Sequence, residues 1–173
     1  MKRSAIDPMP DHFGKYIMLV DDIDLKEALD KSLEQLDHIN LKPLEELGDK
    51  VYAPGKWTVA DIFQHMIDSE RVFAYRALRF ARNDATPLQG FDQNLYAKNI
   101  QPAHRSLSDF WNEFKLVRQS NIMLFDGFDD MVLQRRGIAS GTDISVLALG
   151  FTLIGHQIHH LRIIDEKYLP LAT

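Results

Sequence analysis

The sequence predicts an all-α protein, a four-helix bundle. Two observations indicate this fold class. Four segments carry apolar residues at helical spacing, and each follows a residue that can cap a helix. No segment between them alternates apolar and polar residues convincingly enough to predict a strand. Several long amphipathic helices without strands bury their apolar stripes against one another, and a bundle is the usual result.

The first helix is predicted for residues 25–39. Asp24 can cap its N-terminus, and Glu27 has the spacing of a capping box. Pro43 follows its end. The apolar stripe consists of leucines at steps of three and four residues: Leu25, Leu29, Leu33 and Leu36.

The second helix is predicted for residues 59–82, with Thr58 as its cap. This stretch contains neither glycine nor proline. The linker 83–105 follows it and contains helix-breaking residues, namely Pro87, Gly90 and Pro102. A loop of this length in a small domain is usually functional or wraps the surface.

Two further helices complete the predicted bundle. One covers residues 107–125, with Ser106 as cap and Asp109 in the capping-box position. The other covers residues 146–168, with Ser145 as cap, and its apolar first half predicts a buried core helix.

Residues 129–142, which lie between these two helices, predict a loop with at most one helical turn. Their segment Gly137–Gly141 is one residue away from the nucleophile-elbow pattern of serine hydrolases. Because no strand is predicted before it, we reject that class.

Length, composition and charge narrow the function. The 173 residues suffice for one domain, 1–173, and 45% of them are hydrophobic, as in ordinary globular proteins. The net charge of −5 gives no electrostatic footprint for nucleic acid. The longest apolar run, 146–155, is about half as long as a membrane span, and no apolar run follows the N-terminal Met-Lys-Arg, so we expect no secretory signal. The chain has no cysteine, which excludes a cysteine nucleophile and thiolate ligands and fits a cytoplasmic location.

Two histidines near the C-terminus have the spacing of a metal site. His156 and His160 are four residues apart, so they lie ~40° apart around a helix and one turn apart along it. His159 offers a rival pairing with His156. We prefer His160, because His156 shares an apolar, core-facing stripe, whereas His159 shares a small and polar one and is predicted to flank the site.

The third predicted ligand is His65 in the second helix. Its stripe is also partly buried, and the small Ser69 one turn later leaves room beside an ion. A single histidine on an apolar face is more often a hydrogen-bonded core residue. Burying His156 and His160 together without a metal, however, would leave polar atoms in need of hydrogen-bond partners. Asp68 could orient a ligand, although an exposed acid is the simpler interpretation. Ordinary histidines titrate near pH ~6.5, so metal affinity is expected to fall in mild acid.

Two segments of the chain resemble the signatures of the DinB-like superfamily. The segment 55–58, Gly-Lys-Trp-Thr, opens the helix with His65, and the continuation 70–82 resembles one bacterial branch closely. The segment 155–162, Gly-His-Gln-Ile-His-His-Leu-Arg, resembles the second signature. The resemblance spans nearly the whole chain and implies a four-helix bundle with a long crossover connection. It also implies zinc or nickel on three histidines, which fall on His65, His156 and His160.

The sequence leaves two functions open. The first is a metal-dependent enzyme with a small-molecule substrate, either a hydrolase or, by resemblance, a transferase that uses a low-molecular-weight thiol. The second is a non-enzymatic stress-response or binding module, in which the metal is a structural tie. A fourth ligand would favour the tie, and His104 in the linker could supply it. We also expect a homodimer, because the second helix carries large apolar residues in several directions: Phe73, Tyr75, Leu78 and Phe80. The alternative is that the linker 83–105 covers the additional apolar face within one chain.

Overall fold

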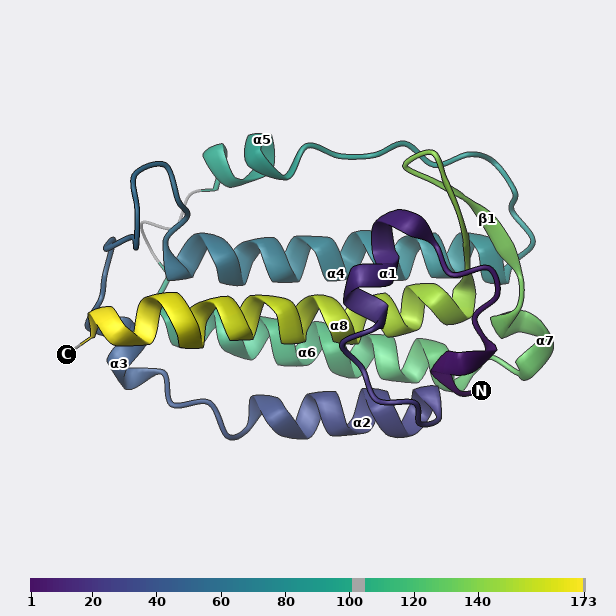
Figure 1. The fold of residues 1–173 in the computed structure, drawn as a ribbon, viewed down its shortest axis with the longest axis horizontal. Coiled ribbons are helices and arrows are strands. Elements are labelled where there is room, and N and C mark those ends of the chain that lie inside the picture. The colour runs from purple at the N-terminus through teal and green to yellow at the C-terminus, as the bar shows by residue number, and fades with distance from the viewer. Residues whose placement is uncertain (101–104, 173) are drawn as a thin grey trace.

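The computed structural model describes residues 1–100 and 105–172 and confirms the four-helix bundle. Its long helices are α2 (Leu25–Leu36), α4 (Val59–Ala81), α6 (Leu107–Asp126) and α8 (Val146–Ile163). α4 packs against α6 and α8, and α2 packs against the same two helices from the opposite side. In Figure 1, α4 is accordingly the uppermost and α2 the lowest of the four long helices, with α8 in front of α6.

The connection between α4 and α6 is the long crossover that the bundle requires. α4 and α6 run in the same direction, so the chain must travel back along the bundle between them (Figure 1). On this path it forms the short helix α5 (Gln93–Lys98), which lies over α4. Near its start the crossover is held by Leu88, which exchanges backbone hydrogen bonds with Ile138 and Ser140.

The predicted helix starts are confirmed. Thr58 and Ser106 form complete capping boxes with residues three positions later, and Asp24 and Ser145 cap α2 and α8 with their side chains. The first predicted helix was too long, since α2 ends at Leu36. The indole of Trp111 donates a hydrogen bond of 2.9 Å to the Leu36 carbonyl, which satisfies a group that another helical turn would have used.

The fourth predicted helix divides into two parts. α8 ends at Ile163, and a π-helix, η3 (Ile164–Tyr168), continues it before the final 3₁₀ turn η4 (Leu169–Leu171). The first half of α8 is buried, as predicted for a core helix. No helix in the described part of the chain is long and apolar enough to cross a membrane.

A β-hairpin corrects the prediction for residues 129–142. The expected helical turn is present as α7 (Asp130–Leu133), but two antiparallel strands follow, β1 (Arg136–Ala139) and β2 (Thr142–Ser145). Ser140 and Gly141 connect them with φ angles of 53° and 77°, the left-handed conformation of tight hairpin turns. Ser140 therefore lies in a hairpin turn and not in a strand-to-helix elbow. The strands escape a pattern search because each has only four residues.

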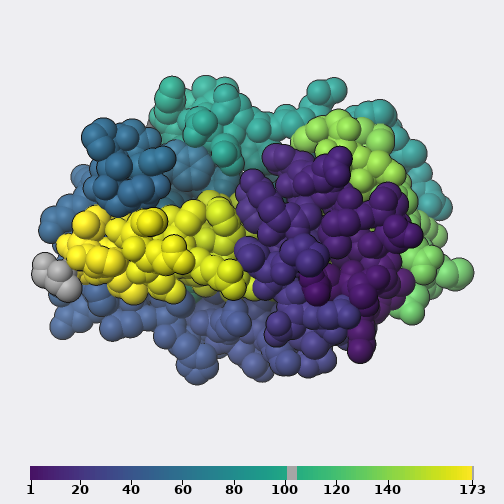
Figure 2. Space-filling model, viewed as in Figure 1, coloured from purple at the N-terminus to yellow at the C-terminus, as the bar shows by residue number. Residues whose placement is uncertain are grey.

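A short N-terminal helix, α1 (Asp11–Ile17), was also missed by the sequence analysis. It follows the 3₁₀ turn η1 (Arg3–Ala5) and crosses α8, and in Figure 2 the N-terminal segment covers part of α8. Gly155 permits this contact, because a Cβ at that position would lie 2.0 Å from the carbonyl oxygen of Tyr16. A last short helix, α3 (Lys42–Glu45), lies in the connection from α2 to α4.

Two apolar clusters form the core, one toward each end of the bundle. The first contains Phe73 of α4 and the N-terminal half of α8, and the second contains Phe63 of α4 and Trp111 of α6. Buried polar residues come mainly from the stretches of helix between these clusters: Ser32, His65, Ser69, Glu70, Arg118, Asn121, His156, Gln157 and His160. The bundle therefore contains a polar layer between two apolar regions.

Candidate metal centre

Three histidines of the polar layer point at one another. His65 comes from α4, and His156 and His160 come from successive turns of α8. The Nε2 atom of His156 lies 3.1 Å from that of His65 and 3.1 Å from that of His160. One nitrogen atom from each ring lies within 4.8 Å of the others, and the three side chains are buried. The structure thus brings together the three residues that the sequence predicts as ligands.

The spacing of these nitrogens fits a shared divalent ion. Two nitrogen ligands at about 2.0–2.1 Å from a tetrahedral ion are separated by about 3.3 Å. The 3.1 Å separations in the cluster are close to this value. A neutral imidazole carries one proton, so without an ion these Nε2 atoms are satisfied only if some of the rings donate an Nε2–H to the lone pair of another ring. A cation on their lone pairs would satisfy all three, so the residues present fit a metal ion.

Burial keeps the three rings in the neutral form that ligands need. Desolvation lowers the pKa of His65 to about 4 and that of His160 to about 2. The pKa of His156 is lowered well below its ordinary value, first by burial and then by the neighbouring His160. The folded chain therefore presents neutral imidazoles from neutral pH down to mild acid.

Neighbouring side chains fix the orientation of the cluster. The Ser69 hydroxyl lies 3.4 Å from Nδ1 of His65, and the ring of Trp57 packs on His65 with centroids 4.8 Å apart. The ring of Tyr16 meets His156 edge to face. Nδ1 of His160 is buried with no partner in the described residues, an atom that a bound water or ligand could satisfy.

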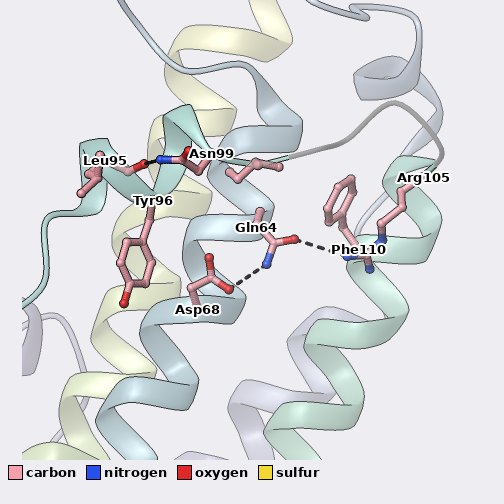
Figure 3. A pocket seen from close by; sticks show the side chains of 8 residues that line it. Gln64, Asp68, Leu95, Tyr96, Asn99, Arg105 and Phe110 are labelled. Carbon is pink, nitrogen blue, oxygen red and sulfur yellow. Dashed lines mark hydrogen bonds between the residues drawn. The ribbon is translucent and has the colours of Figure 1, made fainter.

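His159 and Asp68 lie outside the cluster. His159 is half-buried and packs on Tyr16 and His160, which is the flanking place that the sequence predicts. The amide of Gln64 donates a hydrogen bond of 2.8 Å to Asp68, and both residues line a cavity of about 480 Å³ beneath α5 that contains none of the three histidines. Figure 3 shows this cavity, with the side chain of Tyr96 reaching from α5 to a place beside Asp68. His104 lies outside the described residues.

The sequence analysis missed the ion pair that holds the polar layer together. Glu70 of α4 accepts hydrogen bonds of 2.6 and 2.8 Å from Arg118 of α6, and both side chains are almost completely buried. Arg118 also donates to Ser32 and to the Leu153 carbonyl, so one guanidinium connects four helices. The only sequence signal is an arginine among apolar residues of a helix, and such residues are usually exposed.

Two cavities reach the histidine cluster. The first, about 290 Å³, includes His65 and His156 in its lining, together with Tyr16, Phe73 and Arg76. The second, about 240 Å³, reaches His160 and has a different lining, which includes Trp57 and Tyr168. A small molecule therefore has space beside the three nitrogens.

The fold and the site define a class: four-helix bundles with a crossover connection that carry three convergent histidines on the second and fourth long helices. The sequence pattern of the DinB superfamily matches residues 25–164, and the chain belongs to this superfamily.

A solved structure supports the fold. The chain is similar to YfiT from Bacillus subtilis, with 18% sequence identity and a TM-score of 0.67. The similarity covers 99% of this chain and 93% of that one. YfiT is described as a probable metal-dependent hydrolase with an unusual four-helix bundle topology. No curated protein sequence matches the chain significantly.

Proposed function

We propose that this protein is a metal-dependent enzyme in which His65, His156 and His160 hold one divalent ion, zinc or nickel. The observation that carries the proposal is the convergence of three neutral Nε2 atoms next to a cavity. Among the described residues no fourth histidine, aspartate or glutamate joins the group. Three protein ligands with one open position are typical of catalytic zinc, whereas structural zinc has four. The description of YfiT supports the same class.

When bound, such an ion acts as a Lewis acid and favours the deprotonated form of a water or a thiol. The side chains around the three histidines form the surroundings of this ion. Phe73 and Tyr16 wall the cavity and limit the access of bulk water, while Ser69 and Trp57 hold the His65 ring in place.

The nucleophile distinguishes two reactions, hydrolysis and thiol transfer. The chain contains no cysteine, so a sulfur nucleophile would have to come from a small cosubstrate. Two separate cavities meet the cluster, which suits a reaction with two substrates. Both features favour a low-molecular-weight thiol as one substrate, and such thiols are abundant in the reducing cytoplasm, where we place the protein.

A second candidate is a structural metal in a non-enzymatic protein. It is favoured by the position of the ligands, since His65 on α4 and the pair on α8 would tie two helices together. The two apolar clusters, however, pack the same helices independently of the histidines. We therefore expect the metal-free protein to remain folded.

The test begins with the metal content of protein purified without an affinity tag. Mass spectrometry should find about one divalent ion per chain, and His156→Ala or His160→Ala should abolish its retention, because two ligands remain. His159→Ala is the matched control and should retain the ion. Stoichiometric metal in the double variant H156A/H160A would refute the site.

Activity then separates the two candidates. Metal-loaded protein is screened against esters and small electrophiles, with and without a thiol, and the circular dichroism of chelated protein is recorded. Turnover that chelation removes, with the helical signal unchanged, supports the enzyme. Loss of helical structure on chelation, without turnover of any substrate, would establish the structural tie.

A further inference from the structure

Arg76 is a buried cation without an acidic partner. Its side chain is 2% exposed, and its hydrogen bonds run from Nη2 to the Gln89 carbonyl at 3.0 Å and to the Ser140 hydroxyl at 2.8 Å. The other buried arginine, Arg118, has the carboxylate of Glu70. In the described part of the chain no carboxylate lies within ion-pair distance of Arg76. An arginine keeps its charge even when buried, and an unpaired buried charge is costly.

The free face of this guanidinium belongs to the cavity beside the histidine cluster. Arg76 lines the 290 Å³ cavity together with His65 and His156. Its Nε and Nη1 atoms have no hydrogen-bond partner in the described residues, and neither is a completely enclosed atom. Both are therefore available to a molecule in the cavity.

The geometry of α4 directs the side chain of Arg76 toward the histidine end of this cavity. Arg76 follows His65 by three helical turns, so both lie on one stripe of α4, with Cα atoms about 16 Å apart. Helical side chains lean toward the N-terminus, which directs the long side chain of Arg76 toward His65. The Gln89 carbonyl in the crossover and the Ser140 hydroxyl in the hairpin turn both accept hydrogen bonds from its Nη2 atom, so these two segments hold the guanidinium in place.

The other groups of the cavity suit one negative charge with an apolar body. Phe13, Phe73 and Phe91 contribute aromatic walls. The one acidic residue in the lining, Asp92, is turned to the start of α5, where it accepts hydrogen bonds of 2.8 and 3.0 Å from the backbone amides of residues 94 and 95. A single guanidinium matches a carboxylate, which it can bind in a bidentate manner. The cavity volume of about 290 Å³, about that of ten water molecules, has room for a ligand of roughly ten non-hydrogen atoms.

We propose that Arg76 forms an anion subsite that binds the carboxylate of a small organic acid, whose other end lies at His65 and His156. This inference rests on the proposed function, since it places the substrate of the same site. It assigns to the substrate an acidic group several bonds away from the reacting atom.

The experiment compares hexanoate with hexanamide, two probes of equal size that differ in charge. Binding is measured by isothermal titration calorimetry on zinc-loaded and on metal-free protein. Hexanoate should bind about tenfold or more tightly than hexanamide in both forms. Arg76→Gln should remove this preference and leave hexanamide binding unchanged. Arg82→Gln, which removes an exposed charge from the C-terminal end of α4, is the matched control and should change neither.

Each outcome decides the inference. Equal binding of the two probes by the natural protein overturns it and requires no variant, so a misfolded R76Q protein would not leave it untested. Hexanoate binding that requires zinc and persists in R76Q also overturns it, because the carboxylate then binds the ion. Arg76-dependent binding to metal-free protein supports the subsite even if no metal-dependent turnover is found, so the two proposals can fail separately.

Discussion

The stability of the metal-free protein should fall steeply between pH 7 and pH 5. The cause is the burial of the three neutral histidines. Folding lowers the pKa of His65 from 6.5 to about 4 and that of His160 from 6.5 to about 2. Below pH 6.5 the unfolded chain therefore binds protons that the folded chain excludes, and acid shifts the equilibrium toward unfolding. The loss begins near pH 6.5 and continues until the folded pKa of each group is reached.

The magnitude follows from these values. At pH 5 an unfolded histidine is almost fully protonated, while His65 and His160 remain mostly neutral in the folded chain. Between pH 7 and pH 5, each of these two histidines lowers the free energy of unfolding by about 2 kcal/mol, at about 1.4 kcal/mol per pKa unit. Together they lower it by about 4 kcal/mol. His156 adds to the loss in the same direction. A domain of this size is stable by about 5–15 kcal/mol, so the effect should be easy to measure.

The assay is urea denaturation of chelator-treated protein, followed by circular dichroism at pH 7, 6 and 5. His65→Gln replaces a titrating ring with a neutral polar group, and its loss between pH 7 and pH 5 should be about 2 kcal/mol smaller. The exposed His38→Gln is the control and should behave as the natural protein does. If the natural protein and H65Q showed the same pH dependence, the reasoning from buried neutral histidines would be refuted.

Three further predictions concern the metal, the packing and the assembly. Zinc affinity of the folded chain should stay nearly constant from pH 7 to pH 5, because the pKa of His65 is about 4; a dye-competition titration showing a drop above about tenfold would contradict this. Gly155→Ala should destabilise the protein by about 1–3 kcal/mol in thermal unfolding, since its Cβ would meet the Tyr16 carbonyl at 2.0 Å; an unchanged Tm would show that α1 adapts freely. Light scattering should find a homodimer that buries Tyr75 and Leu78, which are 52% and 37% exposed; a monomer at micromolar concentration would remove that proposal.

The dimer prediction shows how tertiary structure changes an inference from sequence. Four large apolar residues on the second helix predicted a second interface. Two of them, Phe73 and Phe80, are buried within the chain, Phe73 against α1 and Phe80 beside Gly137 of the hairpin. The prediction now depends on Tyr75 and Leu78, because α1 and the hairpin were not visible in the sequence.

The sequence alone determined the four long helices and the pairing of His156 with His160. Both follow from local rules, since helix periodicity and caps depend on neighbouring residues, and a four-residue step places His156 and His160 on one face. His65, which is 91 residues from His156 in the chain, was predicted from its partly buried stripe and from the family resemblance, and the fold brings it to the pair. What the sequence could not determine depends on contacts between distant segments. The partner of Arg118, the support of Arg76 by Ser140 and the close approach of α1 to Gly155 each join residues far apart in the chain. The lowered pKa values of the histidines also could not be determined from the sequence, because only packing removes water from the rings. The sequence analysis used the ordinary histidine pKa and expected metal affinity to fall in mild acid. With the lowered pKa values, this fall is expected at a lower pH.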